Sequence, residues 1–270
     1  MKRVLTVQDL SCLGKCSLTV ALPVLSAMGC VATPLPTAFL STHTAFPGPH
    51  VRDLTEELLP VCEHWRSIGA EFDAIAVGYL SDPRQADAVA AVLDAFSAFK
   101  VIDPVMGDHG KPYSRITSAH VEAMKQLCVR ADVLLPNVTE ACLLTGMPYR
   151  DDGDEDYFRQ LLQDLSAFGP KAVILTGVST APDKLGFAGL EGDRYFFYQA
   201  ENIPLRCHGT GDLFAAVCTG GVMSGKSIED AARLAASFVE RVLKNTPEAT
   251  PFGVPFEEQL PWLWQSLRQR

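Results

Sequence analysis

The residues best suited to chemistry in this sequence form a glycine-flanked turn that leads directly into an apolar helix. The turn reads Gly209-Thr210-Gly211-Asp212. Two glycines allow successive amides to point the same way, and the start of a helix adds unpaired N–H groups and a positive dipole end. Such a turn can hold the oxygens of a phosphoryl group in transfer, and Asp212 could accept the proton of an attacking hydroxyl. Alternatively, Asp212 is an ordinary first-turn acid that stabilises its helix.

Further polar residues follow the predicted strands. Ligands of open α/β sheets gather at the carboxyl ends of strands, so these side chains are expected to share one rim. Each of them alone is weak evidence, because strand ends are naturally polar. The residues are Gln8, Asp9, Tyr79, Asp103, Asn137, Thr176 and Gly177.

The elements that must position these residues alternate between apolar strands and amphipathic helices. Unbroken apolar strands separated by helices indicate a mostly parallel sheet covered on both faces. We therefore predict a three-layer α/β/α fold in one domain spanning 1–270, with an antiparallel hairpin at one edge of the sheet. Predicted strands are 4–7, 31–37, 74–78, 100–103, 132–135, 172–176, 186–190 and 194–199; predicted helices are 15–29, 52–68, 84–98, 118–129, 138–145, 154–168, 211–223, 228–243 and 256–268.

Composition and charge exclude several classes of protein. The 270 residues are 47% hydrophobic and 20% charged, which is a globular rather than a disordered composition. A net charge of −9 with no basic cluster argues against nucleic acid and anionic membranes as partners. The apolar stretch 16–51 is divided by prolines too finely for a membrane span. We expect a cytoplasmic protein whose eight cysteines are mostly free, buried thiols.

Two further segments, taken with the glycine turn, resemble the ribokinase-like superfamily. The first reads Asp103-Pro-Val-Met-Gly-Asp108, and the second is the Asn137-x-x-Glu140 element. The three motifs occur in the order and at the separations typical of that superfamily. The resemblance covers essentially the whole chain.

Within the superfamily, the chain resembles the pyridoxal kinases. Ser41-Thr-His43-Thr44 is similar to their substrate-contacting segment, and Gly78-Tyr79 is similar to a pair whose tyrosine lines the vitamin pocket. These kinases read Gln-Ser-His after the first strand, whereas this chain has Asp9 after Gln8. An acid at that position is similar to hydroxymethylpyrimidine kinases. The segment 12–17 departs from the glycine-rich loops of both groups.

The resemblance implies ATP-dependent phosphorylation of the 5′-hydroxymethyl group of pyridoxal, pyridoxamine or pyridoxine. Asp212 would be the general base, and Gly209, Thr210 and Gly211 would stabilise the transferred phosphoryl group. Asp103, Asn137 and Glu140 would hold Mg²⁺, through water, and the ATP phosphates. Thr176 and Thr210 would contact ATP. Asp9, His43, Thr44 and Tyr79 would line the vitamin pocket, together with Asp212.

The resemblance also implies a homodimer and leaves a K⁺ requirement open. His43 is equally well explained by a structural hydrogen bond. For Cys207, packing is favoured over a reactive thiol in a lid.

Two alternative functions stay open, and two other classes of nucleotide-binding protein are disfavoured. Hydroxymethylpyrimidine kinase would use the same chemistry on a smaller ring, and a non-catalytic B6-binding regulatory protein could retain the fold. A dinucleotide-binding protein is disfavoured, because the region after the first strand lacks Gly-x-Gly-x-x-Gly. The P-loop pattern is also absent, since residues 13–17 lack its first glycine and its spacing.

Overall fold

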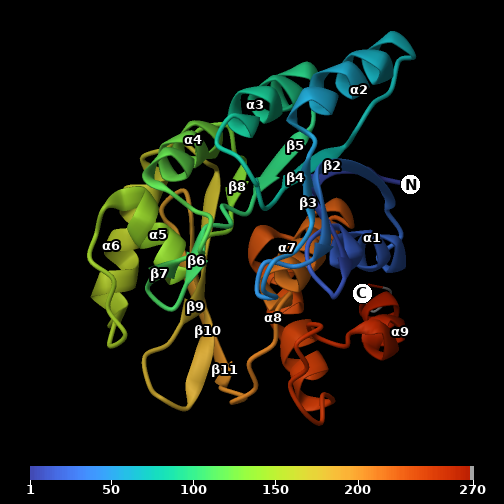
Figure 1. Ribbon diagram of the computed structural model, residues 1–270. Helices are drawn as coiled ribbons and strands as arrows, with labels where there is room; N and C mark the ends of the chain where they lie inside the picture. Colours follow the sequence, from blue (N-terminus) through green and yellow to red (C-terminus); the bar gives the residue numbers. More distant parts are fainter. Residues whose placement is uncertain (268–270) are drawn as a thin grey trace.

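A sheet with helices on both faces forms the centre of the molecule (Figure 1). This computed structural model describes residues 1–267, and among these nine strands follow the order β11-β10-β9-β8-β5-β4-β1-β2-β3. Their bounds are β1 Arg3–Leu13, β2 Val31–Thr42, β3 Val51–Asp53, β4 Ala74–Val77, β5 Phe99–Ile102, β8 Val133–Leu134, β9 Ala172–Val178, β10 Lys184–Glu191 and β11 Arg194–Glu201. The strands from β9 to β2 in this order pair in parallel, whereas β3 pairs antiparallel with β2, and β10 pairs antiparallel with both β9 and β11. The parallel strands therefore end at one common edge.

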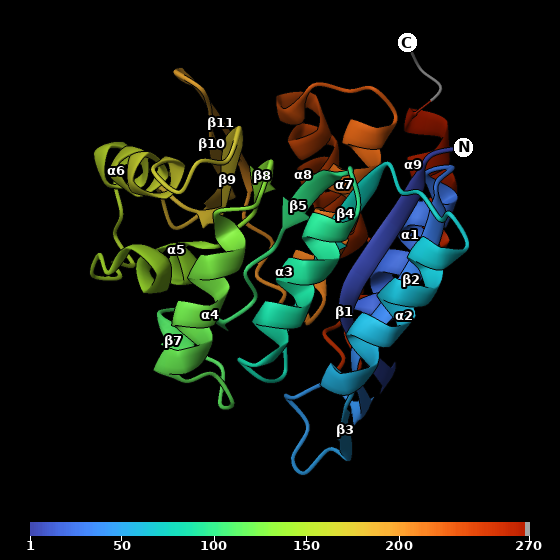
Figure 2. The same cartoon turned by 90° about the horizontal axis from the view of Figure 1, so that it is seen from above.

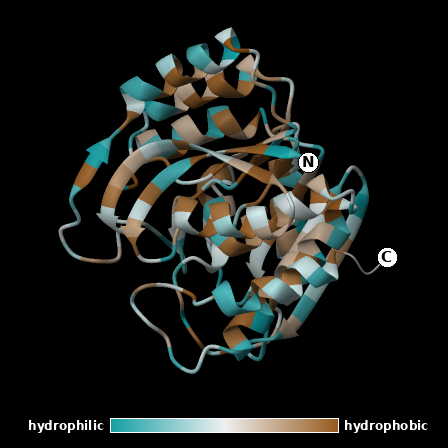
Figure 3. Cartoon of the chain, turned by 90° about the vertical axis from the view of Figure 1, so that its right-hand side faces the viewer, coloured by the Kyte–Doolittle hydropathy of each residue, from teal (hydrophilic) through white to brown (hydrophobic). Residues whose placement is uncertain are grey.

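The helices form two layers, one on each face of the sheet (Figure 2). On one face the buried side chains of α2 to α6 pack against the strands, and on the other those of α1, α7, α8 and α9 do so. Several helix ribbons alternate between teal and brown, as expected of helices that bury only one face (Figure 3). Their bounds are α1 Leu18–Ala27, α2 Thr55–Ser67, α3 Gln85–Ala95, α4 Ser118–Cys128, α5 Val138–Thr145, α6 Glu155–Ser166, α7 Thr210–Met223, α8 Ile228–Lys244 and α9 Leu260–Ser266.

The predicted three-layer fold with its antiparallel edge hairpin is confirmed, with local differences. Strand β2 extends to Thr42, and 52–68 divides into β3 and α2. A small hairpin, β6 Gly107–Asp108 and β7 Lys111–Pro112, lies outside the main sheet and was not predicted. The segment 256–268 holds a short 3₁₀ helix, Glu257–Gln259, before α9, and residue 268 lies outside the described residues. The single-domain organisation stays a prediction.

The largest difference concerns the region between the first strand and the first helix. The helix expected at 15–29 begins only at Leu18, because residues 14–17 form a loop, here called the 14–17 loop. Strand β1 continues to Leu13, well past Val7, where its pairing with β4 ends. The pairing of β1 with β2 shifts register between Gln8 and Leu10. Such irregularities re-aim side chains, and Asp9 lies at this one.

No helix among residues 1–267 has both the length and the apolar character needed to cross a lipid bilayer.

Candidate active site

The predicted glycine turn lies at the start of α7, where residue 209 has a left-handed backbone. Gly209 has φ 86°, and a Cβ atom built there would lie 2.1 Å from the carbonyl oxygen of Lys15. A side chain at this position would therefore collide with the 14–17 loop. By contrast, a Cβ atom on Gly211 would meet nothing within 4 Å. The turn is thus packed backbone against backbone on one side and open on the other, as an anion cradle requires.

Asp212 follows this cradle in the first turn of α7. Burial raises the pKa of its carboxyl to about 6, and the nearby charge of Asp9 adds to the increase. A hydrogen bond from the backbone N–H of Ser17 acts in the opposite direction. Asp212 is therefore a carboxylate whose proton affinity is close to that suited to general-base chemistry near neutral pH.

Asp9 lies beside Asp212 and is 2% exposed. Its carboxylate accepts a hydrogen bond from the Ser11 hydroxyl at 2.7 Å and another from the Ser17 hydroxyl. Burial nevertheless raises the pKa of Asp9. Asp9 does not cap α1, whose N-cap has no side-chain hydrogen bond. In this environment the buried carboxylate can accept a hydrogen bond from a polar group of a ligand.

His43 lies near Asp9 and makes contacts consistent with the structural alternative. Its Nε2–H donates to the carbonyl oxygen of Pro251 at 2.7 Å, and its ring centroid lies 4.7 Å from that of His208 and 4.8 Å from that of Phe46. Thr44 follows it in a turn after β2 and is half-buried. These contacts fix the His43 ring and leave its predicted role at the substrate untested.

Tyr79 follows β4 and is 7% exposed. Its hydroxyl accepts a hydrogen bond from the Arg115 guanidinium, and burial raises its pKa. Arg115 belongs to the loop between the small hairpin and α4. The sequence offered no signal for Arg115, because its loop carries none of the recognised motifs.

Three more predicted residues lie at the ends of β5 and β8. Asn137 and Glu140 form a reciprocal cap of α5: the Asn137 side chain accepts the Glu140 N–H, and the Glu140 carboxylate accepts the Asn137 N–H, both at 2.9 Å. The other Glu140 oxygen accepts the Met106 N–H at 3.0 Å. Glu140 thus joins the loop after Asp103 to the helix after β8.

These acids gather without a compensating cation among the described residues. Burial and the charges of Glu140 and Asp212 raise the pKa of Asp103 well above its usual value. Burial raises that of Glu140 to about 8, despite its N–H donors. The described residues hold no group of three or more His, Cys, Asp or Glu side chains placed as a metal cage. Crowded carboxylates without a full cage fit Mg²⁺, which keeps several waters and takes only one or two protein carboxylates.

A small cavity is lined by both Asp103 and Asp212. It has a volume of about 20 Å³, close to that of one water molecule. Gln8, Asp103, Asp212 and Thr219 supply its polar wall, and alanines of α1, α7 and β4 supply much of the rest. Asp103 and Asp212 therefore face a common space at the carboxyl edge of the sheet.

Thr176 lies near the end of β9, half-buried and bridged to Asn137 by strand-like pairing. Its N–H donates to the Pro136 carbonyl oxygen at 2.9 Å. Its neighbour Gly177 is exposed. Thr176 thus lies next to Asn137 on the rim, on the side away from Asp9.

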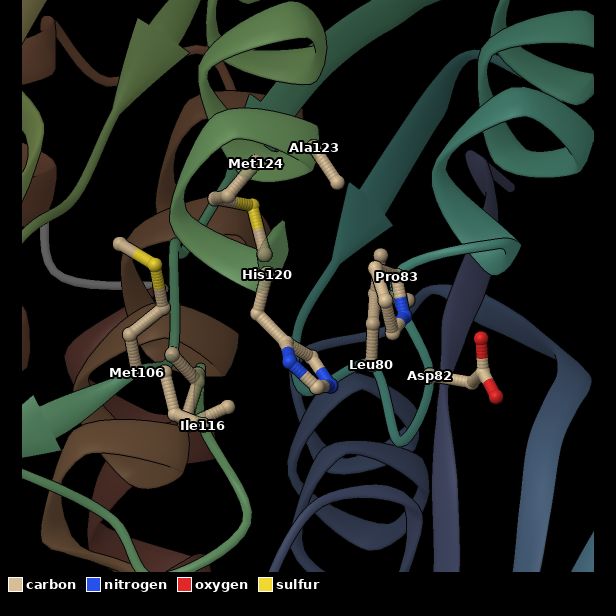
Figure 4. A pocket seen from close by; sticks show the side chains of 9 residues that line it. Leu80, Asp82, Pro83, Met106, Ile116, His120, Ala123 and Met124 are labelled. Carbon is tan, nitrogen blue, oxygen red and sulfur yellow. The ribbon is translucent and has the colours of Figure 1, made fainter. Parts of the chain in front are cut away.

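A second cavity, of about 10 Å³, lies between α4 and the loops that follow β4 and β5, and none of the predicted site residues lines it (Figure 4). Leu80, Met106, Ile116 and Met124 surround His120, while the carboxylate of Asp82 points away from the group. The His120 Nδ1 is engaged in capping α4 through Thr117. Because α4 and the loops around it line the cavity, and no residue of α3 does, we assign it to packing.

Residues 250–256 contact both the 14–17 loop and His208, the residue that precedes the glycine turn. The Phe252 carbonyl oxygen accepts the Lys15 N–H at 2.8 Å, and the Val254 N–H donates to the His208 carbonyl oxygen at 3.0 Å. The Lys15 ammonium also forms an ion pair with Glu257 at 2.5 Å. Neither this segment nor Ser17 was predicted to contribute to the site. No motif marks these contacts, and those of Lys15 join residues more than 200 positions apart.

Comparison with known proteins gives consistent relatives. The family model described as phosphomethylpyrimidine kinase matches residues 21–256. A candidate phosphomethylpyrimidine kinase from Bacteroides thetaiotaomicron, crystallised with pyridoxal, is 35% identical with a TM-score of 0.92, covering 99% of this chain and 96% of its own. The pyridoxal kinase of Lactobacillus plantarum is 33% identical with a TM-score of 0.91, covering 98% of each chain. A pyridoxine/pyridoxal/pyridoxamine kinase from Bordetella bronchiseptica is 28% identical, over 91% of this chain and 90% of its own.

Proposed function

The chain belongs to the phosphomethylpyrimidine kinase family, and from this premise we propose that it transfers a phosphoryl group from ATP to the 5′-hydroxymethyl group of pyridoxal, pyridoxamine or pyridoxine. The observation that carries the proposal is the combination of Asp212, whose pKa is raised to about 6, with an anion cradle open at Gly211. Relatives named as kinases of these vitamers support it, and so does the relative crystallised with pyridoxal.

In the proposed reaction, Asp212 accepts the proton of the vitamer hydroxyl as its oxygen attacks the terminal phosphorus of ATP. The amides of residues 209–211 stabilise the negative charge on the transferred group, which is the main task of protein groups in phosphoryl transfer. Asp9, His43, Thr44 and Tyr79 line the vitamer side of the cradle. Asn137, Thr176 and Thr210 contact the nucleotide.

Mg²⁺ is the metal that fits the carboxylates of Asp103 and Glu140, with Asn137 as an amide neighbour. When bound, Mg²⁺ neutralises phosphate charge. Because both Glu140 oxygens already accept backbone N–H groups, we expect that residue to hold the metal through water. A K⁺ requirement stays open.

Homodimeric assembly and a cytoplasmic location belong to the same proposal. Both rest on the family resemblance alone.

Hydroxymethylpyrimidine phosphorylation is the second candidate. Asp9 favours it, because this position holds serine in pyridoxal kinases and an acid in hydroxymethylpyrimidine kinases, and the matching family model bears the pyrimidine name. The chemistry at Asp212 would be the same.

Turnover of four substrates at equal concentration tests the proposal. Pyridoxal, pyridoxamine, pyridoxine and hydroxymethylpyrimidine are each incubated with ATP and Mg²⁺, and ADP release is measured. We expect kcat/KM to be highest for one of the three vitamers. A preference for the pyrimidine would establish the second candidate. Absence of ADP release with all four would favour the non-catalytic B6-binding protein.

A further inference from the structure

Ser17 has a backbone conformation that is rare for a residue with a side chain. Its φ is 51° and its ψ is −123°. The other non-glycine residue with positive φ among residues 1–267 is His109, which lies in the exposed hairpin turn. Ser17, in contrast, is 4% exposed. Strained backbone of this kind persists only where surrounding contacts hold it, and it concentrates at functional sites.

Helix capping does not account for this conformation. Serine is a favoured N-cap residue, whose hydroxyl normally accepts a backbone N–H of the first helical turn from extended backbone. Ser17 occupies the N-cap position of α1 but makes no such hydrogen bond. Its carbonyl oxygen alone serves the helix, accepting the N–H groups of Val20 and Ala21.

Instead, both remaining polar groups of Ser17 are directed to the candidate active site. The backbone N–H faces the Asp212 carboxylate and the hydroxyl faces the Asp9 carboxylate, and each contact acts to lower the pKa of the acid that it meets. Because the φ of Ser17 is positive, its backbone N–H and its side chain are directed to two different acids, Asp212 on α7 and Asp9 on β1. Ser17 connects the proposed base to the proposed vitamer pocket.

The rest of the 14–17 loop is fixed tightly enough to hold this arrangement. The Thr19 hydroxyl donates to the Cys16 carbonyl oxygen at 2.7 Å and accepts the Cys16 N–H at 3.1 Å. The Lys15 N–H is bonded to Phe252, and the Lys15 carbonyl oxygen leaves no space for a Cβ atom on Gly209. The loop thus contacts both ends of the catalytic turn.

We infer that Ser17 is a positioning residue for the proposed general base. Its backbone N–H, directed by the positive φ, holds the Asp212 carboxylate. Its hydroxyl fixes Asp9 and thereby maintains the positive φ. The inference rests on the proposed function, since it assigns Ser17 a role only through Asp212. A displacement of the base by about 1 Å can lower a rate about 100-fold.

Three substitutions of Ser17 separate the backbone from the hydroxyl. Ser17→Gly removes the hydroxyl but adopts the conformation freely. Ser17→Ala removes the hydroxyl and keeps the steric cost. Ser17→Thr keeps the hydroxyl, but β-branched residues disfavour positive φ most strongly. The matched control is Ser11→Ala, because the Ser11 hydroxyl also donates to Asp9 but no described contact links it to Asp212.

We expect kcat to fall least in the Gly variant, further in the Ala variant, and about tenfold or more in the Thr variant, with KM for ATP changed less than about threefold throughout. Ser11→Ala should affect vitamer KM rather than kcat. A role of the hydroxyl alone predicts the reverse order, with Thr the most active of the three, and that order would overturn the inference. If the Thr variant does not fold, equal kcat values for Gly and Ala would overturn it as well.

A second measurement tests whether Ser17 acts through Asp212. Ser17→Thr is combined with Asp212→Asn, and single-turnover rates are compared. We expect the Thr substitution to have little further effect once the base is removed. The same fold-loss in both backgrounds would show a merely structural role and overturn the inference. Failure of the proposed function is distinguishable, because the unmodified protein would then turn over none of the substrates.

Discussion

Asp212 is the residue on which the proposed chemistry depends most directly. A carboxylate with an ordinary pKa is a weak base, whereas burial and the charge of Asp9 raise the pKa of this one to about 6. At pH 7 it is still mostly ionised and able to accept a proton. The environment that makes it basic is thus also compatible with neutral pH.

Asp212→Asn should lower kcat by about 10²–10⁴-fold, the usual value of general-base catalysis. The affinities for ATP and vitamer should change only a few fold, because asparagine retains the shape and an oxygen acceptor for the Ser17 N–H. In the unmodified protein, kcat/KM should fall as the pH drops below about 6. Steady-state kinetics between pH 5 and 8 check both expectations; a loss of less than about tenfold contradicts the assignment.

The same raised pKa has a consequence for stability. A carboxyl whose folded-state pKa exceeds its unfolded value binds its proton more tightly when folded, so its ionisation opposes folding. The destabilisation is absent below about pH 4, grows between pH 4 and 6, and is complete above pH 6. A shift of about two units corresponds to roughly 2–3 kcal/mol. Asp212→Asn should therefore raise the free energy of unfolding at pH 7 but not at pH 4. Urea titration at both values measures this; an equal effect at both would contradict it.

Asp9 is expected to determine ring preference. An ionised carboxylate accepts hydrogen bonds but cannot donate them, so Asp9→Ser changes what the pocket offers to the ring. A charge-assisted hydrogen bond contributes roughly 1.5–3 kcal/mol, or about 10- to 150-fold in affinity. The substitution should alter the ratios of kcat/KM among the four substrates far more than KM for ATP. If every ratio stays within twofold, Asp9 does not contact the substrate.

At the scale of elements, the strand–helix alternation could be predicted because apolar strands and capped helices are local patterns. The helix predicted at 138–145 coincides with α5, because the two residues that cap it, Asn137 and Glu140, belong to one local motif. The 14–17 loop could not be predicted, because its conformation depends on contacts with Phe252 and Gly209 across the chain. The same holds for the continuation of β1 beyond Val7, where its pairing with β4 ends and only β2 is its partner.

The two glycines of the glycine turn, Gly209 and Gly211, should respond differently to substitution by alanine. Gly209→Ala introduces a Cβ atom at positive φ and 2.1 Å from the Lys15 carbonyl oxygen, so both folding stability and kcat should fall strongly. Gly211→Ala places its Cβ atom in open space, where the phosphoryl group is expected to bind. This variant should fold normally but show a raised KM for ATP. Thermal denaturation with kinetics distinguishes them; equal stability of the two variants would contradict the packing argument.

Glu140 connects two elements, and its substitution tests the metal proposal. Glu140→Gln retains one acceptor oxygen but points an NH₂ group at a backbone N–H, so we expect a lower melting temperature. It should also raise the Mg²⁺ concentration needed for half-maximal rate. An unchanged magnesium dependence would show that Glu140 serves only the cap. Asn137 cannot serve as the control, because it shares that cap.

At the scale of the whole molecule, the parallel strands bring residues from distant positions to one edge. Asp9 and Thr176 lie within two of the parallel strands, and Tyr79, Asp103 and Asn137 follow three others. All five were predicted to share the rim, because parallel strands end at one edge of the sheet. Their individual roles stay predictions, because the strand order fixes where a residue lies but not what it binds. The motifs were sufficient for the family, and the contacts between motifs required the structure.

The position of the 250–256 segment bears on how the protein is made. Its contacts with His43, Lys15 and His208 join the two ends of the chain around the catalytic turn. A nascent chain that still lacks these residues cannot form the closed arrangement behind Asp212, because the contacts of His43, Lys15 and His208 with the segment are missing. Contacts of such large sequence separation also slow folding. The capacity to consume ATP should therefore appear only after residues 250–256 have been synthesised and have packed behind Asp212.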